Sequence, residues 1–433
     1  LGGSGTAVTL ACGATQTGFG RTGTVDWDTT PKTATFTAVS GDGFFANTSG
    51  GAFTMNLPAG SAGAIVSVAD YAGTWQTNNL TVSPNGTDKI GSINADVTLS
   101  TEGQSVTFIF VDSTQGWINT MDSTSNVRAS AFMSATGGTI TTSGDCKIHT
   151  FTGPGTFCVS AISGSCAANN VVSYVVVAGG GGGGGAITTS SGAGGAGGFR
   201  EVKTPLTPYT ASPLDGYPSS PNRVTVTATA FPITVGGGGA GGLGVTPGNG
   251  TPGCNGSNSI FSTITSAGGG RGAREVDAGG NGGSGGGGGG IGTGTPAGGC
   301  GNTPPTSPAQ GQNGGTGGAN PKQGGGGGGG ATAAGGAGSG SAGGAGGAGA
   351  TSSINGTPTA RAGGGGGSVY CGGAPDMGAG GAGGGGAGGY NVNGTAGTTN
   401  TGGGGGATGG TGPSLKNGGA GGSGIVIIRY RFQ

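Results

Sequence analysis

The chain has 433 residues, of which 120 are glycine, and only 7% are charged. The net charge of zero conceals an asymmetry, because residues 1–172 carry five Lys and Arg against ten Asp and Glu, whereas residues 173–433 carry ten against five. The basic residues are too thinly spread for a nucleic-acid-binding face, and no apolar run approaches the roughly 20 residues of a membrane-spanning helix. We therefore expect neither nucleic-acid binding nor membrane insertion.

Residues 1–32 are predicted to be a connector, with Leu1–Gly5 as a joint from a preceding segment. The chain begins with Leu1 rather than Met, so we expect it to be processed or incomplete, and residues before Leu1 stay an open question. The sequence shows no signal peptide. If that absence is genuine, it favours synthesis in the cytosol and release by lysis.

Residues 33–118 are predicted to form a small β domain. Short runs rich in β-branched and aromatic residues are separated by turn pairs such as Asn85-Gly86 and Glu102-Gly103, which is typical of a small sandwich or barrel. Phe108, Phe110 and Trp117 are expected in its core. The predicted strands are 33–39, 43–47, 52–57, 64–69, 79–83 and 104–112.

Residues 119–172 are predicted to be a second β segment that leads into the next domain. Residues 147–151 and 155–159 flank Thr152-Gly153-Pro154, which we interpret as a hairpin turn. Together with residues 171–178 and 424–432, these strands are expected to form one sheet that joins the two ends of the remaining region.

Residues 173–433 contain 96 of the 120 glycines. A flexible linker would be solvated by Ser, Glu or Lys, but apolar segments such as 231–235 and 260–264 interrupt this region. Collagen needs glycine at every third position, and runs of four to seven glycines exclude it. The remaining interpretation is a set of polyglycine-II helices, which have three residues per turn and no internal hydrogen bonds, packed so that they bond to one another.

Long glycine runs begin at Gly285, Gly324, Gly363 and Gly402, at intervals of 39 residues. This spacing suggests a chain that runs up and down one bundle with loops at both ends. We accordingly predict an all-β N-terminal part followed by a glycine-rich domain of packed polyglycine-II helices closed by β strands, with essentially no α-helix.

Four sequence blocks carry a resemblance to a known family: Tyr174 to Gly185, Gly192 to Glu201, Ile233 to Gly242 and Gly421 to Tyr430. In this order they resemble the glycine-rich domain found at the C-terminus of bacteriophage fibre and virion-surface proteins. The packed glycine helices are similar to those of glycine-rich tail-fibre adhesins, in which loops at the tip bind a host receptor.

The N-terminal part also resembles a small β module of phage tail fibres, through residues 41–45, 70–75 and 105–111 followed by Gly116-Trp117. This second resemblance implies attachment or spacing rather than catalysis.

The sequence gives little indication of chemistry. His149 is the only histidine, and no Cys-x-x-Cys spacing occurs among the seven cysteines, so we expect no zinc site, no other metal and no cofactor. The thiols are either buried small hydrophobes or partners in disulfides, and their pairing stays open. Few groups in the glycine-rich part could act as a general acid or base, so we expect no enzyme activity.

Two stretches interrupt the glycine pattern in the manner of binding loops, residues 204–223 and 369–393. Exposed aromatic and Asn side chains on rigid loops suit recognition of a sugar or a protein. The alternative is that Tyr370 and Tyr390 only cap the ends of the glycine helices. The candidate receptor-binding residues are Tyr209, Tyr217, Tyr370, Tyr390 and Asn391.

These observations predict a structural and adhesive bacteriophage fibre or virion-surface protein whose distal glycine-rich domain contacts the host. The alternative is a bacterial extracellular adhesin or filament subunit, and a polysaccharide depolymerase is a third hypothesis. The fibre resemblance implies a homotrimer. Expected partners are other virion proteins through the N-terminal region and a host cell-surface glycan or protein, and the expected location is the virion surface, extracellular after lysis.

Overall fold

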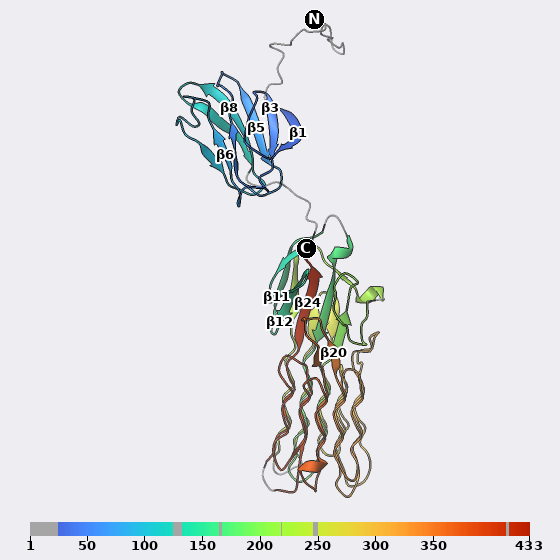
Figure 1. Cartoon of the computed structure of the whole chain (residues 1–433). Coiled ribbons are helices and arrows are strands. Elements are labelled where there is room, and N and C mark those ends of the chain that lie inside the picture. The colour runs from blue at the N-terminus through green and yellow to red at the C-terminus, as the bar shows by residue number, and fades with distance from the viewer. Residues whose placement is uncertain (1–24, 124–131, 164–166, 218, 246–249, 413–414) are drawn as a thin grey trace, which may run out of the picture. The chain divides into compact units, whose positions relative to one another are not determined.

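The computed structural model describes residues 25–123, 132–163, 167–217, 219–245, 250–412 and 415–433. The chain divides into two compact units, residues 1–128 and 129–433 (Figure 1). Within the described residues there is no α-helix, as predicted, and the three short 3-10 helices are η1 (Ala167–Asn170), η2 (Ser220–Asn222) and η3 (Ala374–Asp376). None of these helices is long or apolar enough to cross a membrane.

The N-terminal unit is a sandwich of two sheets between which the chain alternates. One sheet has the order β1-β3-β5-β8-β9 and the other β2-β4-β6-β7. The first six strands pair in parallel within each sheet, because each turn of the chain adds one strand to each sheet. The strands are β1 (Asp26–Lys32), β2 (Phe36–Thr37), β3 (Asp42–Ala46), β4 (Phe53–Asn56), β5 (Ile65–Asp70), β6 (Leu80–Ser83), β7 (Val97–Leu99), β8 (Ser105–Asp112) and β9 (Gly116–Ser123).

The core of this sandwich contains the predicted residues Phe108, Phe110 and Trp117, all of which are buried. The expected boundaries of 33 and 118 are wrong, because β1 pairs with β3 and β9 pairs with β8, so both strands belong to the sandwich. Of the predicted connector, residues 1–24, with the joint at Leu1–Gly5, lie outside the described residues.

Asp70 holds the loops of the sandwich together. Its side chain is buried and its carboxylate accepts hydrogen bonds from the backbone N–H groups of Gly73 (2.9 Å), Thr74 (3.2 Å), Trp75 (3.3 Å) and Gly103 (3.0 Å). Buried backbone donors need partners, and a single carboxylate here serves four of them.

The second unit begins with two facing sheets, of order β10-β13-β17-β18-β19 and β11-β12-β24-β14-β15, with β16 paired to β14. The strands are β10 (Ser134–Thr136), β11 (Thr139–Ser143), β12 (Cys146–Phe151), β13 (Gly155–Ala161), β14 (Val171–Val177), β15 (Phe199–Val202), β16 (Val224–Thr225), β17 (Ala230–Thr234), β18 (Ser259–Phe261), β19 (Ile264–Ser266), β20 (Ala350–Ser352), β21 (Thr359–Arg361), β22 (Gly389–Tyr390), β23 (Thr408–Gly409) and β24 (Ile425–Arg431).

As predicted, β12, β14 and β24 share one sheet, and this sheet joins the two ends of the glycine-rich region. The expected hairpin between β12 and β13 is wrong. Both edges of β12 are occupied by β11 and β24, so the chain crosses after Pro154 and β13 pairs in the facing sheet. The segment 119–172 is therefore divided between the two units, with β9 in the first.

The space between the two sheets is filled by large side chains, including Phe157, Tyr174, Phe261 and Tyr430. The hydroxyl of Tyr174 donates to the carbonyl of Asn222 (2.7 Å), and that of Tyr430 accepts from the N–H group of Ala135 (3.1 Å). The buried aromatic residues thus keep hydrogen-bond partners for their polar ends.

From these sheets the glycine-rich segments run away side by side (Figure 1). Segment 178–185, which continues β14, shows how they pack. Successive N–H groups point to different neighbours, with Gly179 bonded to Ser257 (3.0 Å), Gly180 to Gly422 (2.9 Å) and Gly181 to Gly195 (2.8 Å), before the cycle repeats. This threefold repeat is that of a polyglycine-II helix.

Six neighbours surround segment 178–185. Its N–H groups donate to segments 192–198, 250–257 and 416–424, and its carbonyls accept from segments 236–243, 267–273 and 402–409. The runs that begin at Gly285, Gly324, Gly363 and Gly402 are bonded in the same way on all sides. We call this hydrogen-bonded array the lattice. A segment that other segments enclose on all sides is called interior, and a segment that they do not enclose is called rim.

The lattice requires glycine at interior positions because backbones touch there. A Cβ atom on Gly327 would lie closer than 3.0 Å to the carbonyl oxygens of Ala345 and Gly344. On the rim, by contrast, a Cβ on Gly237 would have no heavy atom within 4 Å. The residues whose side chains point outward on the rim are often alanine, as at Ala345 and Ala379, which are exposed.

Candidate functional site

The loops at the end of the lattice away from the sheets form the candidate functional site, which we call the loop end. Because β14 runs directly into segment 178–185 and segment 192–198 returns directly to β15, the turn between them lies at this end. The loop end comprises residues 186–190, 244–245, 274–278, 291–296, 319–323, 340–341, 370–377, 390–392, 410–412 and 415.

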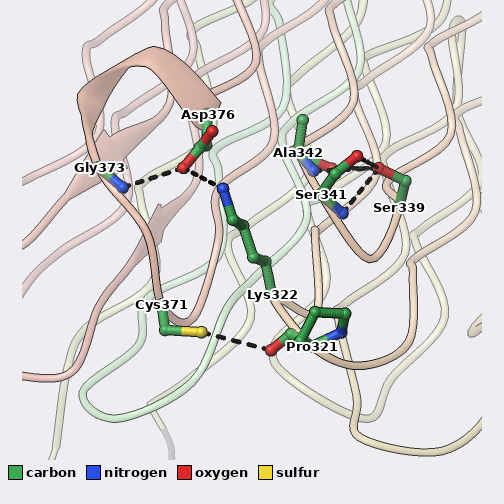
Figure 2. Close-up of polar contacts among 8 residues, drawn as sticks. All are labelled: Pro321, Lys322, Ser339, Ser341, Ala342, Cys371, Gly373 and Asp376. Atoms are coloured by element: carbon green, nitrogen blue, oxygen red, sulfur yellow. Dashed lines mark hydrogen bonds and ion pairs between the residues drawn. The ribbon is translucent and has the colours of Figure 1, made fainter.

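Loops distant in sequence are joined here by direct contacts. Figure 2 shows the ion pair between Lys322 and Asp376 (2.7 Å), and Asp376 also accepts from the N–H group of Gly373 (3.0 Å). The thiol of Cys371 lies 3.3 Å from the carbonyl oxygen of Pro321. These contacts tie loop 319–323 to loop 370–377.

Three exposed aliphatic side chains lie on neighbouring segments at or beside the loop end. Leu243, Val392 and Leu415 are 53%, 58% and 53% exposed. Their backbones are adjacent, since Asn417 accepts a hydrogen bond from Gly244 N–H (3.2 Å) and donates its own N–H to the side chain of Asn393 (3.0 Å). We call these three side chains the apolar row.

The apolar row is distinctive because the described flanks of the lattice expose small residues. Of the described large apolar residues that are exposed, those in the lattice region are Leu243, Val245, Val276, Val392 and Leu415, all at or beside its loops. Exposed apolar clusters are typical of interaction surfaces. Some charged side chains of the loop end are paired, as in the salt bridge between Arg274 and Asp277 (3.0 Å).

The structure places three of the five predicted binding residues at the loop end. Tyr370 and Tyr390 are both only partly exposed. Asn391 has a positive φ of 53°, and its side-chain oxygen accepts from Gly412 N–H (3.0 Å), so it forms the turn that carries Val392.

The other two predicted residues, Tyr209 and Tyr217, lie at the sheet end. The Tyr209 hydroxyl donates to the carbonyl of Val202 (3.3 Å), and Tyr217 packs against the core between the sheets. The structure therefore does not bring the five residues together. Their role in binding stays a prediction.

Sequence reasoning did not single out the apolar row. Its members are isolated aliphatic residues in Gly-, Asn- and Thr-rich stretches, and their adjacency depends on the packing order of the lattice. Their rarity could have identified them in the sequence, because few Leu or Val residues interrupt the glycine-rich segments between 236 and 422.

Two buried ionisable groups lie at the sheet end. His149 is fully buried, donates from Nδ1 to the carbonyl of Gly137 (2.7 Å) and stacks on Tyr430, and burial lowers its pKa. Burial raises the pKa of the Glu201 carboxyl, although hydrogen bonds from Ser212 (2.8 Å) and Ser352 (2.5 Å) oppose this shift.

Within the described residues, no three His, Cys, Asp or Glu side chains come together as a metal site. The described cysteines are free thiols, with Cys146 buried and the others at least partly exposed. Cys12 and Cys166 lie outside the described residues.

The fold and the loop end define a class of protein in which a backbone lattice, closed by a β-sheet, holds a set of loops at its far end. The family model of the glycine-rich domain matches residues 152–431, and the chain belongs to this family. No curated protein matches the sequence.

Proposed function

We propose that this chain is a structural, adhesive protein of a bacteriophage fibre or virion surface, and that its loop end contacts the host cell. The observation that supports this function best is the confinement of exposed aliphatic side chains to the loop end of a lattice whose flanks expose small residues. The resemblance of the glycine-rich blocks to phage fibre proteins supports the phage origin.

In this proposal the chain is not an enzyme. It assembles as a homotrimer and is located on the virion surface. The partners are other virion proteins through the N-terminal unit and a host-surface glycan or protein through the loop end. A bacterial extracellular adhesin or filament subunit is the second candidate. This candidate would use the same loop end for binding. A secretion signal encoded upstream would favour the bacterial adhesin, whereas neighbouring tail or capsid genes would favour the phage protein.

A binding assay tests the adhesive function. The purified, fluorescently labelled chain is incubated with a panel of bacterial strains, and the wild-type protein is expected to bind at least one of them. Replacing Leu243, Val392 and Leu415 together by Ser should weaken binding by about a hundredfold, if each aliphatic group contributes about 1 kcal/mol.

The matched control is Ile140→Ser, which removes an exposed aliphatic side chain from β11, in the same unit but at the sheet end. This control should bind as the wild type does. No binding to any strain would contradict the adhesive function, and degradation of host polysaccharide by the purified chain would contradict the absence of catalysis. Light scattering that shows a monomer at micromolar concentration would contradict the trimer.

A further inference from the structure

The outer face of the larger sheet in the N-terminal unit carries exposed aromatic side chains. Phe44 of β3 belongs to the core of the sandwich, so the alternation along a strand places its neighbours Gly43 and Phe45 on the outer face. Trp27 of β1 pairs with Gly43 and therefore lies on the same face. Because Trp27 is 43% exposed, this face offers an indole ring to the solvent.

The indole of Trp27 is supported from below and from one side. A Cβ atom on Gly43 would lie within 3.0 Å of two carbon atoms of the ring, so glycine lets the indole rest on the backbone of β3. The ring of Phe45 lies beside it, with 4.9 Å between the ring centroids and 32° between the ring planes. Gly43 and Phe45 thus hold one side of the indole and leave the other side to the solvent.

A third aromatic residue, Tyr71, follows β5 directly. Its N–H group donates to the carbonyl of Ala46 (3.1 Å), so the pairing with β3 continues beyond the end of the strand. The preceding residue, Asp70, is buried and directed inward, where it accepts from the N–H group of Gly103 (3.0 Å). The alternation therefore places Tyr71 on the outer face, and it is 53% exposed.

Trp27, Phe45 and Tyr71 lie on a diagonal across β1, β3 and β5, which we call the aromatic diagonal. Its ends are separated by two strand spacings and by four residues along a strand, which together correspond to about 16 Å. This length exceeds that of a single sugar ring or amino-acid side chain. The aromatic diagonal therefore suits an extended ligand with a repeating unit.

Hydroxyl groups continue the outer face from β5 toward β9. Ser67 and Thr107 share a hydrogen bond (2.7 Å), and so do Ser105 and Ser123 (2.6 Å). The first pair is buried, whereas the second is partly exposed. A bond between two hydroxyls uses only one of their two O–H donors and leaves lone pairs on both oxygens. The pair of Ser105 and Ser123 can therefore both donate to and accept from a ligand.

The outer face carries no charged residue among the described strands of this sheet. Residues 25–123 contain nine acidic residues against two lysines. Those in the strands of the larger sheet alternate with the outer-facing residues: Asp26, Asp28, Lys32, Asp42, Asp70, Asp112 and Asp122. An anionic ligand would be repelled by the acidic unit, and a cationic ligand would meet no carboxylate on this face. The charge distribution thus favours a neutral ligand.

We propose that the aromatic diagonal binds a neutral, β-linked glycan built of gluco-configured pyranose rings. In such a ring the hydroxyl groups are equatorial, so both faces present axial C–H groups. The face of an aromatic ring carries negative charge density that attracts these C–H groups, and burial of the apolar faces adds to the contact. Successive sugar rings meet Trp27, Phe45 and Tyr71 in turn, and their hydroxyls reach the pair of Ser105 and Ser123.

Quenching of tryptophan fluorescence in the full chain tests this site. Trp75 and Trp117 are fully buried, so iodide should quench Trp27 alone. Cellohexaose or chitohexaose at millimolar concentration should lower the quenching constant at least twofold, because a bound sugar covers the exposed side of the indole. Unchanged quenching with both hexasaccharides would overturn the proposal.

Titration calorimetry with the same hexasaccharides tests the individual residues. Trp27→Ala and Tyr71→Ala should each weaken binding at least tenfold, whereas Trp27→Phe keeps an aromatic ring and should lose less. The matched control is Ile93→Ala, which removes a side chain that is 64% exposed from the loop between β6 and β7. Wild-type affinity in both alanine variants of the diagonal, or an equal loss in the control, would overturn the assignment. Fluorescence of Trp75 and Trp117 in urea checks that each variant is folded.

Two further measurements separate the aromatic diagonal from the loop end and from self-association. The combined variant Leu243→Ser, Val392→Ser, Leu415→Ser should bind the hexasaccharides as the wild type does, and loss of binding in it would move the glycan site to the loop end. Self-association that Trp27→Ala abolishes, with no protection of Trp27 by a hexasaccharide, would assign this face to a second copy of the chain and overturn the proposal.

Discussion

The lattice model is tested most directly by a single methyl group at an interior position. Gly327→Ala adds a Cβ that would overlap the carbonyl oxygen of Ala345 and so force segment 342–349 away from segment 324–331. Two hydrogen bonds hold these segments together nearby, Gly344 N–H to Gly325 (2.9 Å) and Gly347 N–H to Gly328 (2.9 Å).

The expected magnitude follows from these contacts. Loss of two hydrogen bonds costs about 1–3 kcal/mol, and overpacking adds about 1–3 kcal/mol. The free energy of unfolding of the second unit should thus fall by about 2–6 kcal/mol, and its melting temperature by on the order of 10 °C.

Gly237→Ala is the matched control, because its Cβ would meet no atom within 4 Å. It should leave stability unchanged or raise it by about 0.4–1 kcal/mol, since alanine restricts the unfolded chain. Scanning calorimetry of the full-length variants measures both effects. The three tryptophans, Trp27, Trp75 and Trp117, all lie in the first unit, so tryptophan fluorescence should report an unchanged transition in both variants. Equal melting of the second unit in the two variants would refute the lattice reasoning and revive a flexible glycine-rich linker.

Three further predictions concern buried polar groups. Asp70→Ala leaves four backbone N–H groups without their acceptor and should destabilise the first unit by about 2–4 kcal/mol, seen as a lower urea midpoint in tryptophan fluorescence, and an unchanged midpoint would contradict the role of this carboxylate. Burial lowers the pKa of His149 below its ordinary 6.5, so the unfolded chain binds this proton at a higher pH than the folded chain does. The free energy of unfolding of the second unit should therefore fall as the pH drops below about 6.5. Denaturant titrations at several pH values should show this fall in the wild type and not in His149→Gln. Burial raises the pKa of Glu201 above its ordinary 4.5, so the folded chain binds this proton at a higher pH than the unfolded chain does. Protonation of Glu201 should therefore raise the free energy of unfolding of the second unit as the pH falls from neutral toward 4.5. The same titrations should show no such rise in Glu201→Gln, and an identical pH profile in wild type and variant would contradict this role of Glu201.

The glycine-rich fold was predictable because its cause is local. Runs such as 324–330 have no side chains with which to build a hydrophobic core, and bonding between backbones is the remaining source of cohesion. The spacing of 39 residues also had structural meaning, since all four runs that define it are interior segments.

Other features depend on contacts between distant parts of the chain, and sequence patterns could not show them. The apolar row exists because segments far apart in sequence end side by side at the loop end. Likewise, residues 1–32 were predicted to be a connector, and only the parallel pairing of β1 with β3 places residues 26–32 in the sandwich. The predicted hairpin after β12 failed for the same reason, because β24 arrives from the far end of the chain to occupy the edge.

The pairing of β14 with β24 has a consequence for how the second unit folds. Val177 lies opposite Ile425, so the entire lattice is, in topological terms, the connection of a single two-stranded ribbon. Closing a connection of this length costs about 3–4 kcal/mol more than closing a four-residue turn, and the strand that closes it is synthesised only after the whole lattice. The central sheet therefore cannot be completed before the lattice has been synthesised, and dominance of such distant pairings makes folding slow. Until β24 arrives, the edges of β12 and β14 that it will occupy are both open to pairing with another molecule.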